Sequence, residues 1–402
     1  MHYIRLLRPA KLDGKKPIAS LLITITTDLG DSFLYPDEPV DLLVSAEDPV
    51  GQSVISKTGQ IQPLRWRWTA GMRVLDIKIP LHAHLKRDDV TCTVKIHPAA
   101  QPLPLGALKS NDVLPWRFDE GSPVGRGLIM PVSVEMVRGV CSPVSLRTLQ
   151  FSISSRPEDQ LSLDLEEDIG ESIARHIWDA GVVTASFLAD ACRINEGVRD
   201  TLPIRHNSFS VLELGSGVGI LGVTLALIVE NAAAAQNQTL NGSTILLTDL
   251  AEAEERARSN ILRAKAVLSR SHITNSKVTL EYEDLDWDEG RLGQFGPLAS
   301  AHPWDLVILS DCTYNVDSLP ALVGTLSALH TANRKHAENQ IFTKTSVILA
   351  TKPRHSSEQA LFGLLKADDW RYSVLKSIPL PKLGEDNEVV DIYTLEKGDG
   401  NS

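Results

Sequence analysis

The chain has 402 residues, and at roughly 150 residues per domain this length predicts two or three domains. Hydrophobic residues make up 43% and charged residues 23%, which excludes a disordered or a fibrous chain. The net charge of −11 argues against a general nucleic-acid binder, because such proteins neutralise phosphates with Lys and Arg.

The charge is divided unevenly along the chain. Residues 1–150 carry 18 basic and 15 acidic residues, while residues 151–402 carry 22 and 36. The four cysteines form no C-x-x-C pair, which favours a reduced compartment, and no stretch reaches the roughly 18 apolar residues of a membrane span. The amino-terminal residues are interrupted by charge before a signal-peptide core could form. We therefore expect a cytoplasmic or nuclear protein that binds neither nucleic acid nor membranes.

Residues 1–144 are predicted to form a mostly β domain without catalytic residues, acting in substrate recognition. Short apolar runs alternate with turn residues, as in Val74–Ile79. The segment Arg65-Trp66-Arg67-Trp68 is either a half-buried strand or a contact surface of two aromatics and two cations. We expect no metal site, because His82 and His84 have no third ligand in view. Residues 98–127 are predicted to be a long loop.

Residues 145–402 are predicted to form an α/β domain. Two strands near residues 145–153 and 161–165 and a helix near 170–191 come first. Strands and helices then alternate and end in a hairpin, which indicates a doubly wound sheet. The strands are expected at 210–214, 244–248, 278–283, 304–310, 346–351, 372–378 and 389–395.

A glycine-rich segment follows the first strand of that alternation, where Glu213-Leu214-Gly215-Ser216-Gly217-Val218-Gly219 precedes a helix. Without Cβ atoms a ligand can approach the backbone, and a helix N-terminus offers free N–H groups. Two registers compete: a dinucleotide fingerprint ending at Gly222, and the class I methyltransferase pattern Glu213-x-Gly215-x-Gly217-x-Gly219. An acid two residues before the first glycine suits a cofactor that has a cationic amino group and no pyrophosphate. The motif therefore favours S-adenosylmethionine over NAD.

The next two strands end in residues that suit the rest of such a cofactor. Asp249 stands where a ribose would lie, although it could instead cap the following helix. Trp287 stands where an adenine would be flanked, and its alternative is a core position.

The fourth strand leads into Ser310-Asp311-Cys312-Thr313-Tyr314, which resembles the D-x-x-Y motif of the seven-strand lysine methyltransferases known as methyltransferase family 16. The segment Ile177–Gly181, the Glu213–Gly219 run, Asp286-Trp287 and Arg354 support the resemblance. It covers about residues 145–395, and the chain is most similar to the fungal elongation-factor lysine methyltransferases. The resemblance implies a class I, Rossmann-like, seven-stranded methyltransferase sheet that binds S-adenosylmethionine.

The resemblance also implies two groups of site residues. The catalytic pair is Asp311 and Tyr314, which would orient the target lysine. The residues that would bind the cofactor are Trp178, Glu213, Gly215, Ser216, Gly217, Gly219, Asp249, Trp287 and Ser310. Cys312 is expected to be a packed thiol.

We therefore expect a protein-lysine N-methyltransferase that acts on a protein substrate, such as a translation elongation factor. A small-molecule N-methyltransferase acting on a nicotinamide-type amine and a non-catalytic cofactor-binding scaffold are the alternatives. The sequence does not identify the target lysine. It does not determine the oligomeric state either, and we favour a monomer.

Overall fold

The computed structural model describes residues 1–13, 16–56, 63–82, 90–99, 106–117, 128–152, 160–170, 172–193, 208–235, 242–270, 278–336, 345–381 and 388–398. The chain divides into two compact units, and both are discontinuous in sequence. The first unit comprises Met1–Gln150, Ser162–His176 and Leu380–Asn387. The second comprises Phe151–Leu161, Ile177–Pro379 and Glu388–Ser402.

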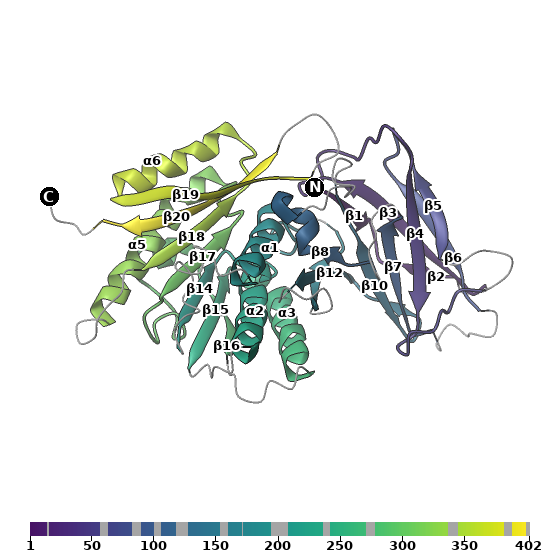
Figure 1. Ribbon diagram of the computed structural model, residues 1–402, viewed down its shortest axis with the longest axis horizontal. Helices are drawn as coiled ribbons and strands as arrows, with labels where there is room; N and C mark the ends of the chain where they lie inside the picture. Colours follow the sequence, from purple (N-terminus) through teal and green to yellow (C-terminus); the bar gives the residue numbers. More distant parts are fainter. Residues whose placement is uncertain are drawn as a thin grey trace. The chain divides into compact units, whose positions relative to one another are not determined.

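The first unit contains two sheets (Figure 1). The smaller sheet is formed by β1 (His2–Leu6), β2 (Lys11–Leu12), β3 (Ile18–Thr26), β6 (Leu75–Pro80) and β9 (Ile129–Met130). The larger sheet is formed by β4 (Val40–Glu47), β5 (Leu64–Trp68), β7 (Cys92–Pro98), β8 (Leu108–Lys109), β10 (Val132–Val137), β11 (Val140–Cys141), β12 (Val144–Ser152) and β13 (Gln160–Asp168). One apolar core joins residues of both sheets, such as Ile23 and Val94, which defines a β-sandwich.

Two features of the first unit differ in detail from the sequence-based expectation. Most of β12 and most of β13, which the sequence assigned to the second domain, belong to the first unit, where β12 pairs with β10. The described part of the predicted loop 98–127 contains β8 and two 3-10 turns, η3 (Ser110–Val113) and η4 (Pro115–Arg117). Strand patterns identify strands but not their partners, so the sheet that β12 joins was not visible in sequence.

The segment Arg65–Trp68 is an edge strand with its residues on alternating sides. Trp68 is buried, and Arg65 and Arg67 both pair with Asp41, at 3.0 and 2.9 Å. The guanidinium of Arg67 hydrogen-bonds to Asp41 and lowers the pKa of that carboxyl. These contacts favour the half-buried strand over an open cationic surface. His84, one of the two histidines weighed as metal ligands, lies outside the described residues.

A buried ion pair connects β12 to β13 within the first unit. Arg147 contacts Glu167 at 2.5 Å, and both side chains are almost fully buried. Arg147 also donates to the carbonyl oxygens of Met130 and Pro131, at 3.4 and 2.8 Å. The residues before β12 therefore supply acceptors and a strand partner that β12 needs.

A chain that begins at residue 141 should accordingly be insoluble. It would lack β10 and the two carbonyl oxygens that Arg147 contacts, and it would expose the apolar side of β12. Soluble yield and size-exclusion chromatography beside the intact chain check this expectation. A monodisperse fragment with a cooperative thermal transition would show that β12 and β13 do not depend on the preceding strands.

The second unit is built on a seven-stranded sheet with the order β16-β15-β14-β17-β18-β20-β19. Its strands are β14 (Ser210–Leu214), β15 (Ser243–Asp249), β16 (Val278–Asp284), β17 (Leu306–Ser310), β18 (Ser346–Thr351), β19 (Trp370–Pro379) and β20 (Val389–Lys397). Numbered along the chain, this order is 3-2-1-4-5-7-6. The first five strands are parallel in the Rossmann order, and β20 is antiparallel to both of its neighbours. The predicted class I, seven-stranded sheet is confirmed.

Helices cover both faces of this sheet (Figure 1). One face carries α1 (Asp179–Arg193), α2 (Ile220–Ala235) and α3 (Ala251–Arg270). The other carries α5 (Leu319–His336) and α6 (Ala360–Ala367), whose apolar residues share a core with β14, β17 and β18. Short helical turns are α4 (Trp287–Gly290), η8 (Val316–Ser318) and η10 (Ser356–Gln359). No helix among the described residues is long and apolar enough to span a membrane.

Helix α1 begins at Asp179, and the prediction of a helix from about residue 170 is wrong. The preceding residues form a closed loop, in which Asp168 N–H donates to Arg175 O at 3.1 Å and Gly170 has a φ of 126°. Such a φ is incompatible with a right-handed helix.

Candidate active site

The glycine-rich turn between β14 and α2 has a backbone that only glycine adopts readily. Gly215, Gly217 and Gly219 have φ values of 61°, 54° and 82°. The N–H of Ser216 donates to Thr248 O at 3.0 Å, and that of Gly217 donates to the Asp249 carboxylate at 2.7 Å. These bonds hold the turn against the end of the neighbouring strand β15.

Two side chains close the space next to Gly215. A Cβ atom at this position would lie 2.6 Å from the Cys312 sulfur and 3.1 Å from the Trp287 ring. Burial raises the pKa of the Cys312 thiol well above its usual value, so Cys312 is the packed thiol that was predicted. Trp287 is half-buried and packs on the core, while its ring also lies beside Gly215.

Two acids flank the turn. Glu213 is buried in β14 and accepts the N–H of Gly222 in α2 at 2.8 Å. Burial raises the pKa of Glu213 to about 8, although the bond from Gly222 partly opposes the shift. Asp249 is half-buried and accepts N–H groups from Gly217 and from Leu250, at 2.7 Å each. Its oxygens retain further lone pairs, so these bonds to the backbone leave acceptor capacity for a ribose.

Replacing Glu213 by Gln should make stability less dependent on pH. The folded chain holds a proton on Glu213 up to about pH 8, whereas the unfolded chain releases it near pH 4.3. Burial of Glu213 therefore destabilises the wild type progressively between these values, while Gln stays neutral and can accept the Gly222 bond. The unfolding free energy of Glu213→Gln relative to the wild type should rise between pH 5 and 8 by at least about 1 kcal/mol. Urea unfolding at several pH values measures it, and a constant difference would contradict the burial of a protonated Glu213.

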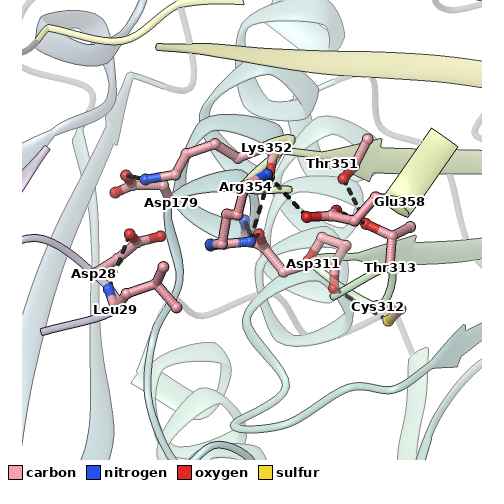
Figure 2. Close-up of polar contacts among 12 residues, drawn as sticks. Asp28, Leu29, Asp179, Asp311, Cys312, Thr313, Thr351, Lys352, Arg354 and Glu358 are labelled. Carbon is pink, nitrogen blue, oxygen red and sulfur yellow. Dashed lines mark hydrogen bonds and ion pairs between the residues drawn. The ribbon is translucent and has the colours of Figure 1, made fainter. Parts of the chain in front are cut away.

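The motif after β17 begins with a strained residue. Asp311 has a φ of 56°, in a region that residues other than glycine rarely adopt. Its N–H donates to Ala350 O at 3.0 Å, and its two carboxylate oxygens accept from Arg354 at 2.7 Å and from Gly181 N–H at 3.1 Å. The carboxylate is thus fixed from two sides at the N-terminus of α1 (Figure 2).

Gly181 and Ser310 explain how α1 approaches this motif. A Cβ at Gly181 would lie 2.8 Å from an Ile220 methyl group and 3.5 Å from the Ser310 hydroxyl. Glycine therefore allows α1 to pack closely on α2 and to present its N–H to Asp311. Trp178, which precedes α1, lies beneath the Arg354 guanidinium, with 5.4 Å between the Arg354 Cζ and the ring centroid.

The remaining residue of the predicted catalytic pair, Tyr314, is 52% exposed. Burial of its hydroxyl end, together with the nearby acids Asp249 and Glu252, raises the pKa of Tyr314. The phenol is therefore neutral at physiological pH and presents a surface-accessible aromatic ring beside the turn.

A second polar network, formed by residues after β18, contacts the Asp311–Tyr314 motif and the start of α1 (Figure 2). Glu358 is buried and accepts the Thr313 hydroxyl at 2.6 Å, while Thr313 also contacts the Thr351 hydroxyl at 2.7 Å. Lys352 is buried and contacts Asp179, the first residue of α1, at 2.8 Å.

The supporting roles of Lys352, Glu358 and Asp179 were not predicted from the sequence. Lys352 and Glu358 follow β18 closely, and Asp179 lies inside the Ile177–Gly181 segment that supports the family resemblance. A charged residue directly after a parallel strand lies at the carboxyl edge, where ligands bind in such sheets, and that signal could have indicated Lys352.

All the predicted site residues lie in the second unit, and most of them fall into two groups. Asp249 and Trp287 lie against the glycine turn, and Trp178, Ser310 and Asp311 gather at the start of α1. Cys312 connects the groups, because it follows Asp311 in the chain and packs against Gly215. The arrangement provides a turn that can receive a nucleoside-like ligand, with a fixed carboxylate and an exposed tyrosine at its edge.

Comparison with known proteins yields one family and several relatives. The profile of a family described as lysine methyltransferase matches residues 157–368. A UPF0665 family protein of Schizosaccharomyces pombe, C23C4.06c, is 29% identical over 370 residues, which cover 90% of this chain and 92% of that protein. The protein-lysine N-methyltransferase EFM6 of Saccharomyces cerevisiae is 24% identical over 209 residues, covering 51% of this chain and 74% of EFM6. Among solved structures, Pyrococcus horikoshii TYW2 in complex with MeSAdo is similar at a TM-score of 0.32 and 9% identity, covering 68% and 80% of the two chains.

Proposed function

Because this chain belongs to the lysine methyltransferase family, we propose that it methylates the side-chain nitrogen of a lysine in a folded protein. S-adenosylmethionine is the cofactor, and the chain is a methyltransferase that depends on it. The observation that carries the proposal is the Asp311-x-x-Tyr314 motif, in which a carboxylate is fixed at the sheet edge beside an exposed tyrosine. The similarity to a protein-lysine N-methyltransferase over half of the chain supports it further.

The residues of the glycine turn fit the cofactor. Gly217 has a φ of 54° and carries no Cβ, as a closely approaching ligand requires, whereas the space beside Gly215 is filled by Cys312 and Trp287. The Ser216 hydroxyl is buried and has no hydrogen-bond partner within the described residues, so a polar ligand at the turn would satisfy it. We assign the turn, Asp249 and Trp287 to cofactor contact, with Trp178 and Ser310 at the boundary toward the amine. Glu213 is buried, holds its proton up to about pH 8 and accepts the Gly222 N–H, so we assign it to supporting the cofactor site from beneath the turn and not to pairing with a cationic amino group.

When bound, S-adenosylmethionine supplies a methyl group on a positively charged sulfur. The task of the chain is then to align the lysine nitrogen with that methyl group and to exclude water. A lysine with a pKa of about 10.4 has only about one neutral side chain in 10³ at pH 7, so it must lose a proton first. Asp311 already pairs with Arg354, which makes its carboxylate a weak proton acceptor. We therefore assign Asp311 to orienting the amine, and the proton leaves to water.

Tyr314→Phe should reduce turnover about tenfold and leave the affinity for S-adenosylmethionine within about threefold. We expect the hydroxyl to help align the lysine, while the half-exposed ring that remains in Phe can still contact the ammonium. Steady-state kinetics and calorimetry measure the two quantities. Equal losses of turnover and of S-adenosylmethionine affinity would instead indicate that Tyr314 contacts the cofactor.

The substrate we propose is a translation elongation factor, bound in part by the first unit. The S. pombe relative is similar over 90% of this chain, so it shares the first unit as well as the second. A β-sandwich of this size is more than a small amine would require. Such a substrate places the chain in the cytoplasm, with the nucleus as the alternative.

Three parallel incubations with labelled S-adenosylmethionine test this proposal. The first contains an intact elongation factor, the second a short peptide of that factor with the unmethylated target lysine, and the third nicotinamide or a free polyamine. We expect methyl-lysine only in the intact factor by mass spectrometry, slower transfer at 300 than at 50 mM salt, and much slower transfer by Asp311→Asn. Turnover of the peptide or the small amine at a rate matching the protein would favour the small-molecule alternative instead.

A further inference from the structure

We propose that Arg354 is a positioning residue that couples the Asp311 motif to Trp178, so that the amine side and the cofactor side of the site adopt one joint arrangement. The inference rests on the proposed function, which assigns Asp311 to the amine and Trp178 to the cofactor boundary.

The contact with Asp311 is short and shielded from solvent. The Arg354 Nη1 lies 2.7 Å from Asp311 Oδ1, and the two side chains are 10% and 6% exposed. The other oxygen accepts the Gly181 N–H, so both oxygens have a fixed donor. Removing the guanidinium would leave a buried carboxylate without its countercharge, which is strongly unfavourable.

The same guanidinium also lies over the Trp178 ring, with 5.4 Å between Cζ and the ring centroid. Trp178 directly precedes α1, and the first residue of α1, Asp179, is held by Lys352. A planar guanidinium can donate along its edge and stack through its face, whereas a lysine ammonium cannot combine the two. One side chain therefore fixes the carboxylate and the tryptophan relative to each other.

The backbone of Arg354 is itself fixed to the motif. Its N–H donates to Glu358 Oε1 at 2.9 Å, while Glu358 Oε2 accepts the Thr313 hydroxyl at 2.6 Å. Thr313 lies between Asp311 and Tyr314, so a single buried carboxylate connects the Arg354 backbone to the middle of the motif (Figure 2). Displacement of either segment would be transmitted to the other.

Two double-mutant cycles in the full-length chain test the coupling. The first combines Arg354→Met with Trp178→Leu and measures the Kd of S-adenosylmethionine by calorimetry. The second combines Arg354→Met with Asp311→Asn and measures both kcat on the protein substrate and the unfolding free energy. Arg371→Met, at an exposed arginine of β19, is the matched control and should change none of these quantities.

We expect Arg354→Met to weaken cofactor binding at least fivefold and to lower kcat at least tenfold, with non-additive effects in both cycles. Arg354→Lys keeps a cation for Asp311 but loses the plane that stacks on Trp178. It should therefore weaken S-adenosylmethionine binding as much as Arg354→Met does, while its kcat should fall less than threefold. This variant also carries the test if Arg354→Met does not fold. A merely structural role would lower the unfolding temperature of both variants equally without the split between Kd and kcat.

Additive effects in both cycles, or unchanged Kd and kcat in Arg354→Met, would overturn the inference. If the chain methylates no protein, the proposed function fails, but the Kd cycle with Trp178 and the unfolding cycle with Asp311 still decide the role of Arg354. The two failures are therefore distinguishable.

Discussion

Gly217→Val should weaken S-adenosylmethionine binding more than about 100-fold, which corresponds to about 2.7 kcal/mol, while the chain stays folded. Gly217 has a φ of 54°, which a β-branched residue avoids, and its N–H bonds to Asp249 at 2.7 Å. Valine would therefore displace the turn from Asp249 and also place methyl groups where the ligand must approach the backbone. Isothermal titration calorimetry measures the affinity.

Gly293→Val is the control for backbone strain alone. Gly293 has a φ of 75° in the same unit, and a Cβ there would meet nothing within 4 Å. It should reduce stability in a similar way but leave the affinity unchanged. If Gly217→Val and Gly293→Val bind S-adenosylmethionine equally well, the cofactor does not contact this turn. Binding of NAD by the wild type would instead favour the dinucleotide register of the glycine motif.

Asp311→Asn should lower kcat about 100-fold, or about 2.7 kcal/mol in the barrier, and change the Kd of S-adenosylmethionine less than threefold. Asparagine has the same shape and tolerates the left-handed backbone at φ 56°, so the loss would come from the missing charge. Without that charge, Arg354 loses its ion pair and the amine loses its orienting carboxylate. Stopped incubations with labelled cofactor give kcat, and calorimetry gives Kd.

Asp369→Asn provides the matched control, because Asp369 has a φ of 53° and follows α6, outside both groups of site residues. The same substitution in the same backbone conformation should leave kcat unchanged. Equal losses of kcat and cofactor affinity in Asp311→Asn would remove the distinction between binding and catalysis at this motif.

Most of the second unit could be predicted from local patterns. The buried strands and the turn at Gly215–Gly219 have clear sequence signals, because glycine is required where φ is positive. The start of α1 could not be predicted, since a lone glycine such as Gly170 does not by itself end a helical pattern, and the bond from Asp168 N–H to Arg175 O that closes the loop is visible only in the structure.

The partners of the charged residues were the least predictable part of the site. Arg354 and Asp311 are 43 positions apart, and Lys352 and Asp179 are 173 apart. No periodicity connects such residues, and only the folded sheet brings them to one edge. Arg354 was noticed only through the family resemblance, and its contact with Trp178 required the structure.

The discontinuity of both units bears on how the protein is synthesised. The first unit includes Leu380–Asn387, where Leu128 N–H donates to Pro381 O at 2.9 Å, and β20 (Val389–Lys397) completes the second unit between β18 and β19. Every described strand of the first unit ends by Asp168, so the sandwich can form early in translation, whereas the seven-stranded sheet lacks an inner strand until β20 has emerged from the ribosome. Domains generally fold as units, in order of synthesis, and here the second unit can finish only when nearly the whole chain has been made. A premature stop codon between β18 and β20 would therefore remove strands from the seven-stranded sheet and leave every described strand of the sandwich in place.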